Sequence, residues 1–293
     1  MSLNIFETKA QVFEVAENLN LPTGLTISGT DLYFASIADG NILKIDMTDT
    51  NLPVIPTIVA SNVPDSRGIA MSGENLYVLY SDNKIAKIDL TVNPPIKTDI
   101  VTGIFLTGLA VDDNTLYYSD MGSQFGGDIG KVYKLDLNIP NAEPVVLVEN
   151  FNAPANLKPD GTVLYFVQNG PYLSTRKVLK IDLLGDFPAT PTELVTDFDN
   201  FVNDFDIRGN EIYVIDREVD NSKIIKADIS GDLPATPSDF IIELLNPISL
   251  LFNENDLYVA EMGQGMIEGE GKILKYTLEP AVGIGEIDKK IQL

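Results

Sequence analysis

The amino-acid sequence predicts an all-β fold, a six-bladed β-propeller built from four-stranded antiparallel blades. One phrase, which begins with "LY" or "IY" and ends in "KID" or a close variant, recurs six times along the chain. Its tyrosines lie between 40 and 48 residues apart, and short apolar runs bounded by Gly, Asn, Asp and Pro fill the intervals. Repeats of this period with four short strands each are typical of propeller blades. The repeat tyrosines are Tyr33, Tyr77, Tyr117, Tyr165, Tyr213 and Tyr258.

The first repeat shows the four predicted strands in order. They read "GLTISG" at 24–29, "DLYFAS" at 31–36, "NILKID" at 41–46 and "PTIVAS" at 56–61. Each is apolar at alternate positions and is followed by turn residues, which is the pattern of a short β-strand. The later repeats follow the same order, and no stretch shows a clear helical period.

The sixth repeat lacks a fourth strand of its own. After its strands at 248–252, 257–261 and 272–278 comes "EPAVGIGE", which is a poor strand sequence. Residues Gln11 to Glu17 match the fourth strands of other repeats, so we predict that this N-terminal strand closes the last blade and leaves no unpaired seam. A solenoid, the alternative, would need polar capping repeats at both ends. The predicted divisions are a leader at 1–10, the propeller at 11–279 and a tail at 280–293.

Two phrases resemble known propeller repeats. "PTGLTISGTDLY" at 22–33 is similar to the NHL type of six-bladed propeller, and "LYYSDMG" with "GKVYKLDL" at 116–137 is similar to the YWTD repeat of receptor ectodomains. The resemblance implies the fold and leaves the activity open, because such propellers serve as scaffolds, receptors and enzymes.

Residues that recur in every blade are best explained by the blade itself. We expect the repeat tyrosines to pack between blades. A lysine precedes each "KID" aspartate slot by two residues, and on a strand these positions share a face. We therefore interpret the lysines as repeated structural contacts between strands. They are Lys44, Lys87, Lys134, Lys180, Lys226 and Lys275.

The composition excludes several classes of function. The formal net charge is −23, which argues against nucleic acid and anionic membrane surfaces as partners, since both need a basic face. The chain has no His and no Cys, so His-based catalytic triads and His-ligated zinc are excluded. Acid–base chemistry must come from Asp, Glu, Tyr or Lys. No apolar run is long enough for a membrane span, and we expect a monomer.

Site residues should lie where the repeats disagree at one end of the ring. Nine residues before each repeat tyrosine, the first three blades have Gly and the last three have Asn156, Asp204 and Ser249. The neighbouring slot and the end of the second strand add further polar groups. The predicted ligand-binding residues are Arg67, Asp120, Asn156, Gln168, Asn203, Asp204, Asp216 and Glu261. Carboxylates and amide oxygens are ligands of Ca²⁺, so a calcium site is predicted at Asn156, Asn203, Asp204, Asp216 and Glu261.

A second resemblance bears on activity. "FVNDFDIRGNEIYVID" at 201–216 and "APANLKPDGTVLYF" at 153–166 are similar to segments of the gluconolactonase and senescence-marker family. The resemblance implies a divalent metal at the mouth and lactone hydrolysis, with Asn156, Asn203 and Asp204 at the matching positions. The chain departs from the family where "LPTGL" stands in place of an early Glu ligand, and "ANL" lacks the family's Gly.

Two long loops are predicted at the same end of the ring. They follow the second strands of blades three and six, read "SDMGSQFGGDIGK" and "AEMGQGMIEGEGK", and carry the apolar residues Phe125, Met266 and Ile267. Blades three and six lie opposite each other in a six-bladed ring. The two loops are therefore either a pair of lids over the pore or surface decoration.

The C-terminal segment bears on location. "EPAVGIGEIDKKIQL" resembles the segment that precedes the sorting domain of type IX secretion cargo, and the first ten residues have no signal-peptide pattern. The resemblance implies an extracellular or cell-surface protein.

The sequence thus favours a secreted or surface propeller that binds a protein or a small ligand at an acidic funnel, without catalysis. The alternative is a metal-dependent hydrolase or lactonase that uses the same face. A purely structural repeat module is a third possibility.

Overall fold

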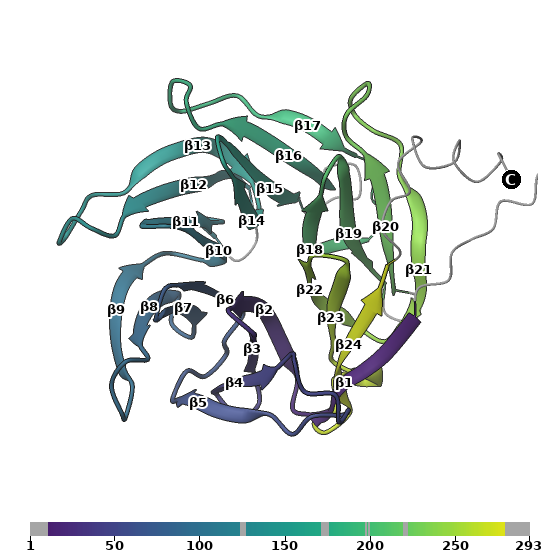
Figure 1. Ribbon diagram of the computed structural model, residues 1–293. Helices are drawn as coiled ribbons and strands as arrows, with labels where there is room; N and C mark the ends of the chain where they lie inside the picture. The colour runs from purple at the N-terminus through teal and green to yellow at the C-terminus, as the bar shows by residue number, and fades with distance from the viewer. Residues whose placement is uncertain are drawn as a thin grey trace, which may run out of the picture.

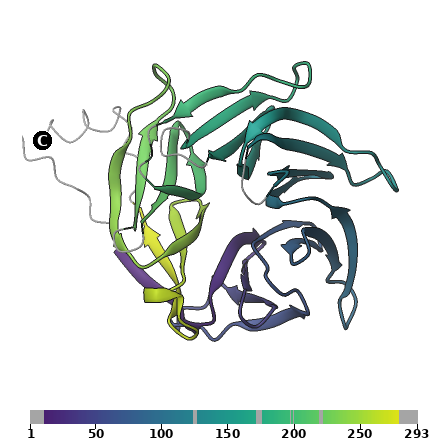
Figure 2. The ribbon, with the colours of Figure 1, turned by 180° about the vertical axis from the view of Figure 1, so that it is seen from behind.

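A ring of six four-stranded antiparallel sheets makes up the molecule, as the repeat pattern predicts (Figures 1 and 2). The computed structural model describes residues 11–123, 127–170, 176–196, 198, 200–218 and 222–278. The predicted leader, the tail from 280 and Phe125 lie outside these described residues.

Each blade begins with an inner strand at the central channel and ends with a strand at the outer edge. Blade 1 consists of β2 (Pro22–Ser28), β3 (Asp31–Ser36), β4 (Asn41–Asp46) and β5 (Thr57–Ser61). Blade 2 consists of β6 (Gly68–Ser72), β7 (Asn75–Tyr80), β8 (Lys84–Asp89) and β9 (Ile96–Thr102). Blade 3 consists of β10 (Leu106–Asp112), β11 (Thr115–Asp120), β12 (Asp128–Asp136) and β13 (Val145–Asn152).

The second half of the ring repeats this order. Blade 4 consists of β14 (Pro154–Asp160), β15 (Val163–Asn169), β16 (Arg176–Asp182) and β17 (Thr192–Val195). Blade 5 consists of β18 (Phe201–Arg208), β19 (Glu211–Arg217), β20 (Ser222–Asp228) and β21 (Ser238–Leu244). Blade 6 consists of β22 (Pro247–Asn253), β23 (Asp256–Glu261), β24 (Gly271–Thr277) and, from the other end of the chain, β1 (Gln11–Leu19).

The N-terminal strand closes the ring, which confirms the prediction. Strand β1 runs antiparallel to β24, from the pair Gln11 and Thr277 to the pair Leu19 and Gly271. The amide of Val54 in the next blade also donates to the carbonyl of Val15 at 2.7 Å. The closing strand is therefore held both within its own blade and by its neighbour.

The repeat tyrosines are buried between blades, as expected. Tyr33, for example, belongs to a hydrophobic cluster that includes Ile69 and Val78 of the next blade. All six tyrosines are at most 9% exposed, and each lies in the cluster that its blade shares with the following one. The core is thus divided into six clusters between neighbouring sheets.

Three of the repeated lysines, Lys44, Lys226 and Lys275, pair with an acidic residue at the start of the second strand and not with the residue two positions later. Lys44 pairs with Asp31 on the second strand at 2.5 Å, whereas Asp46 accepts the amide of Thr48 at 2.8 Å and so orders the following turn. The same division holds in blade 5, where Lys226 pairs with Glu211 and Asp228 accepts from Ser230.

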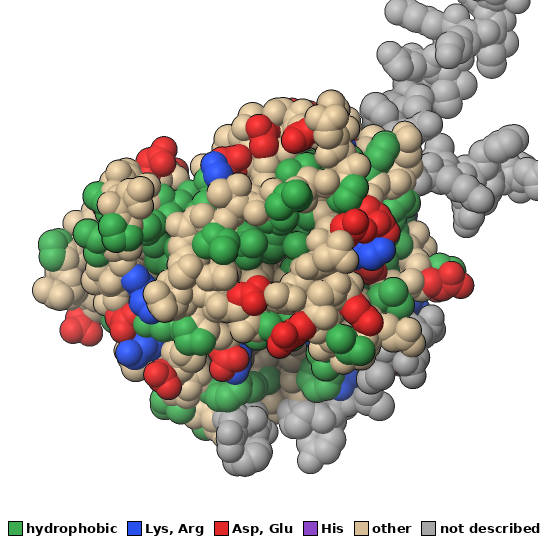
Figure 3. Space-filling model, turned by 90° about the horizontal axis from the view of Figure 1, so that it is seen from below, with side chains coloured by type: hydrophobic (Ala, Val, Ile, Leu, Met, Phe, Trp, Pro, Cys, Tyr) green, Lys and Arg blue, Asp and Glu red, His purple; other side chains and the backbone are tan. Residues whose placement is uncertain are grey.

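A second series of ion pairs joins the third strand of a blade to its outer strand. The pairs are Lys84–Asp99, Lys131–Glu149, Lys177–Glu193, Lys223–Asp239 and Lys272–Glu14. On the edge of the ring shown in Figure 3, basic side chains accordingly lie beside acidic ones. Within the described part of the chain, no helix is long and apolar enough to cross a membrane.

Candidate functional site: a polar cavity in the central channel

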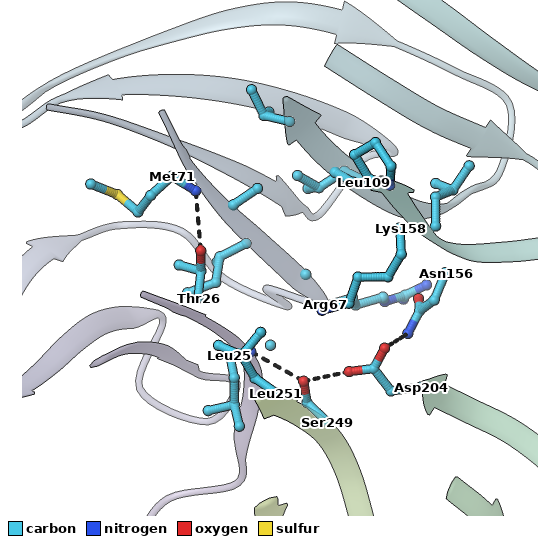
Figure 4. A pocket seen from close by; sticks show the side chains of 18 of the residues that line it. Leu25, Thr26, Arg67, Met71, Leu109, Asn156, Lys158, Asp204, Ser249 and Leu251 are labelled. Carbon is cyan, nitrogen blue, oxygen red and sulfur yellow. Dashed lines mark hydrogen bonds between the residues drawn. The ribbon is translucent and has the colours of Figure 1, made fainter. Parts of the chain in front are cut away.

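The inner strands enclose a cavity of about 210 Å³ in the central channel. Inner-strand residues of all six blades line it. Figure 4 shows its walls, which are polar on the side of blades 4 to 6 and largely apolar on the side of blades 1 to 3. The polar residues of its lining are Thr26, Arg67, Asn156, Lys158, Asp204 and Ser249.

In blades 1 to 3 the wall is built from backbone at the glycine slots. A Cβ on Gly108 would lie 2.9 Å from the Cα of Asn156, so glycine allows blades 3 and 4 to approach there. Gly24 has φ of +59° and also sits close to the backbone of blade 2. Gly68 differs, because the nearest atom to its Cβ would be 3.9 Å away. The size of a side chain introduced at Gly68 is thus limited only by the space in the cavity.

In blades 4 to 6 the same slots form a chain of hydrogen bonds that crosses three blades. The Asn156 amide nitrogen donates to Asp204 Oδ1 at 3.2 Å, and the Ser249 hydroxyl donates to Asp204 Oδ2 at 2.7 Å. Ser249 Oγ in turn accepts the amide of Leu25 in blade 1 at 3.1 Å. Polar side chains therefore join these blades where glycine backbone joins the others.

Asp204 is the central member of this chain. Backbone amides of Phe205 and Leu250 donate to its two oxygens at 2.9 and 3.1 Å, in addition to Asn156 and Ser249. Each oxygen thus accepts two hydrogen bonds, which is its full capacity. Burial raises the pKa of the Asp204 carboxyl, and the nearby Lys158 and these hydrogen bonds oppose the rise.

A second polar layer lies two residues further along the inner strands. Lys158 Nζ is 3.3 Å from Asp206 Oδ1, and the amide of Phe252 donates to Asp206 Oδ2 at 2.8 Å. Lys158 follows Asn156 by two residues and Asp206 follows Asp204 by two, so both layers come from one face of β14 and β18. Carboxylates of blade 5 therefore accept backbone amides of blade 6 twice.

Arg67 stands at the entrance to the inner strand of blade 2. Its backbone amide donates to the carbonyl of Leu79 at 2.9 Å, which fixes the start of the side chain. Its guanidinium lies 5.9 Å from the centre of the Phe105 ring. In Figure 4 the side chains of Arg67 and Lys158 are drawn beside Asn156. Two cationic groups thus line the same cavity as Asp204.

The other predicted site residues lie elsewhere. Asn203 is next to the cavity, where its carbonyl accepts from the Asn156 amide at 2.5 Å and its own amide donates to the Pro247 carbonyl at 3.3 Å. Asp120 accepts the amides of Ile104 and Phe105 at 2.8 and 2.9 Å. These contacts hold the segment that enters blade 3.

Slots at the end of the second strand share this anchoring role. Glu261 accepts the amide of Leu245 at 2.8 Å, and Ser36 donates to the Asn20 carbonyl at 2.7 Å. Asp216 is buried and interacts electrostatically with Arg176, and Gln168 is half-buried on β15. The structure thus brings together Arg67, Asn156, Asn203 and Asp204, and places Asp120, Gln168, Asp216 and Glu261 on the second strands.

The five predicted calcium ligands do not meet at one point. Asp216 and Glu261 lie on second strands, and among the described residues there is no group of three or more acidic side chains that could hold a metal ion. Asp204 already accepts four hydrogen bonds from protein donors. As placed, these residues do not fit a divalent cation, and we derive no chemical step through one. Their role as metal ligands stays a prediction.

Sequence reasoning missed Lys158 as a cavity residue. Asn156 was selected by its slot in the repeat, and strand alternation places Lys158 on the same side of the strand two residues later, so the signal was available. Ser249 occupied the correct slot but was not included among the predicted site residues.

The predicted lids are described only in part. In the blade 6 loop, a short 3₁₀ turn at Gln264–Met266 brings the Met266 sulfur within 3.2 Å of Arg217 in blade 5. Met266 and Ile267 are both about half exposed, at 50% and 55%. The role of this loop as a lid stays a prediction.

Comparison with known proteins shows the fold alone. No protein-family profile and no curated protein sequence matches the chain. Similar solved structures include a luciferin-regenerating enzyme, with TM-score 0.69 and 15% identity over 94% of this chain and 96% of that one. A gluconolactonase from Xanthomonas campestris has TM-score 0.69 and 12% identity, over 92% of this chain and 89% of that one.

A third similar structure comes from the nidogen/laminin complex, with TM-score 0.60 and 14% identity over 76% of this chain and 80% of that one. Gluconolactonase-like propellers are therefore among the structural neighbours, at low sequence identity. NHL or YWTD membership is not established by these comparisons.

Proposed function

We propose that the central cavity is a small-molecule site and that the protein is a hydrolase of the lactonase type. One observation carries the proposal: a buried carboxyl with a raised pKa, Asp204, lines the same cavity as the cations Arg67 and Lys158. An acid–base group next to a cation that can stabilise a developing oxyanion is what ester hydrolysis needs.

The proposed reaction is the addition of water to a cyclic ester. The water oxygen bonds to the carbonyl carbon, the carbonyl oxygen becomes an oxyanion, and the ring C–O bond then breaks to give a hydroxy acid. Lys158 stabilises the oxyanion. Asp204 takes the proton from the water by exchanging its longest hydrogen bond, the 3.2 Å bond from Asn156, and returns it to the leaving alkoxide.

The structural neighbours support this class of reaction in kind. The Xanthomonas campestris protein is a gluconolactonase, and the sequence segments around Asn156 and Asp204 were independently found to resemble that family. At 12% identity the likeness carries the fold, so the substrate is part of the proposal. A location outside the cell or on its surface is likewise proposed from the resemblance of the C-terminal segment.

Hydrolysis of a panel of five- and six-membered sugar lactones, followed by acid release in weak buffer, tests the proposal. We expect turnover by the wild type and a loss of at least about 100-fold in kcat/KM for Asp204→Asn, as is usual for an acid–base group. Asp112→Asn, an exposed inner-strand acid of blade 3, serves as the matched control. Equal rates for wild type and Asp204→Asn would overturn the proposal.

A second candidate, a propeller that binds without catalysis, is favoured by one observation. Asp204 accepts four protein hydrogen bonds, which suits a structural acceptor as well as an acid–base group. Binding of the hydroxy-acid products without turnover of any lactone would select this candidate.

A further inference from the structure

Nine lysine ion pairs lie in the described part of the chain. All nine of them join a lysine to Asp or Glu, and Lys158 in the cavity is among these lysines. Arg67 takes part in none of them. Among the described residues its guanidinium has no acidic partner within 4 Å, in a protein whose formal net charge is −23.

The other polar groups of the cavity are already engaged by the protein. Asp204 accepts four hydrogen bonds, Ser249 both donates and accepts, and the Asn156 amide nitrogen donates to Asn203 and Asp204. Arg67 is exposed and makes no side-chain hydrogen bond to a described residue. The guanidinium, with five N–H donors, is therefore the main unsatisfied polar group that faces a ligand.

The place of Arg67 is fixed well enough to select a ligand. Its backbone is tied to β7 through Leu79, and its guanidinium lies over Phe105 of blade 3. Asp65 and Asp82 line a second pocket together with Arg67 and Phe105, but neither carboxylate is within ion-pair distance of the guanidinium. A planar fork of donors at the rim of a cavity suits a carboxylate or phosphate, which it can bind through two parallel hydrogen bonds.

We infer that the ligand of the central cavity carries an anionic group, a carboxylate or a phosphate, and that Arg67 binds it. Lys158 adds positive charge deeper in the same cavity, although Asp206 neutralises part of it. This inference rests on the central cavity being the ligand site, as proposed above, and is independent of whether the ligand is hydrolysed. For a lactone, it predicts that the enzyme prefers substrates with an additional anionic group.

Two matched pairs of probes isolate the charge of the ligand. Glucose 6-phosphate differs from glucose by its phosphate, and gluconate differs from glucitol by its carboxylate. Binding is measured by isothermal titration calorimetry at low and high salt. We expect at least one anion to bind, its neutral partner to bind at least about 10-fold more weakly, and the affinity to fall as salt rises.

Variants of Arg67 and Lys97 show which residue is responsible for the preference for anionic probes. Arg67→Gln should weaken binding of the anion by about 10- to 100-fold, since a hydrogen bond to a charged group is lost, and Arg67→Lys should keep part of it. Lys97→Gln makes the same change in net charge on the exposed outer strand of the same blade. It should bind like the wild type, and melting temperatures confirm that each variant is folded.

The outcomes separate this inference from the proposed function. Equal affinity for anionic and neutral probes, no binding by any probe, or unchanged binding by Arg67→Gln would overturn the inference. If a neutral lactone is hydrolysed but the anionic probes bind no more tightly than their neutral partners, the lactonase proposal stands and the anion inference fails. If anions bind through Arg67 and no lactone is hydrolysed, the reverse holds.

Discussion

In the two halves of the inner wall, neighbouring blades are joined by different chemical groups. At Gly24 and Gly108 the backbone of the following blade approaches so closely that a Cβ would lie 3.1 and 2.9 Å from it. Blades 4 to 6 meet through Asn156, Asp204 and Ser249, whose hydrogen bonds cross two blade boundaries. A ring of near-identical repeats is therefore chemically asymmetric at its centre, and the cavity takes Asp204 and Lys158 from the polar half and Arg67 from blade 2.

The difference shows that a slot in a repeat can be structural and functional at once. Glycine closes a boundary by removing a side chain, whereas Asp204 closes one by accepting donors from blade 6. A site can therefore arise within the repeat without adding a loop, provided that the replacing side chain takes over the contact that backbone made elsewhere.

The largest expected effect comes from breaking the polar half. Asp204→Ala leaves the buried amides of Phe205 and Leu250 and the Ser249 hydroxyl without their acceptor, which should lower the free energy of unfolding by about 3 kcal/mol. Urea denaturation measures the change. Asp112→Ala, on the inner strand of blade 3 but exposed, should stay within about 0.5 kcal/mol of the wild type. Similar small effects for both variants would show that the hydrogen-bond chain does not hold the blades.

A smaller effect is expected in the glycine half. Gly108→Ala should cost about 1–3 kcal/mol, because its Cβ would lie 2.9 Å from the Cα of Asn156 and the two blades would have to move apart. Gly68→Ala is the matched control, since its nearest neighbour would be 3.9 Å away. We expect it to be neutral or stabilising by less than about 1 kcal/mol. Equal losses at both positions would refute the close-approach explanation.

The pH dependence of stability provides a sharper test of Asp204. Burial raises its pKa above the unfolded value, so the folded state binds the proton more tightly. Its contribution to stability is then present at low pH and is lost as pH rises through the folded pKa. Relative to Asp204→Asn, the wild type should therefore gain in melting temperature between pH 7.5 and pH 4.5. Using the difference between the two proteins cancels the carboxyls whose pKa is lowered, such as Asp99 and Glu211. A difference that does not change with pH would contradict the assignment.

Calcium should have the smallest effect. Because Asp204 accepts four protein hydrogen bonds as placed, we expect millimolar Ca²⁺ to shift the melting temperature by less than about 1 °C. A clear rise that EDTA reverses and Asp204→Asn removes would show the opposite, namely that Ser249 and Asn156 give way to a metal. The metal role predicted from sequence would then hold.

The fold was predictable from sequence because the strand pattern of one blade recurs six times along the chain. Alternation set the strands, and the missing fourth strand of the last repeat pointed to Gln11–Glu17 as its replacement, which β1 confirms. Slot counting also placed Asn156 and Asp204 at the axis. Asp120 and Glu261 could not be separated from site residues in this way, because a sequence does not show which backbone amides will face a carboxylate. Their contacts to Phe105 and Leu245 come from the connection between blades, and that connection has no periodic signal.

The closure of blade 6 determines the order in which the molecule can be completed during synthesis. Strand β1 leaves the ribosome before the other strands of the ring but pairs with β24, so pairing has to follow the synthesis of some 250 further residues, which takes roughly ten seconds to a minute at usual rates of translation. During that interval it is an unpaired strand whose apolar face includes Val15, Ala16 and Leu19. Glu14 and Glu17 lie on the same strand, and their charges discourage pairing with another nascent chain. Strand β1, which completes the ring, thus also carries acidic residues that protect it against aggregation until β24 has been synthesised.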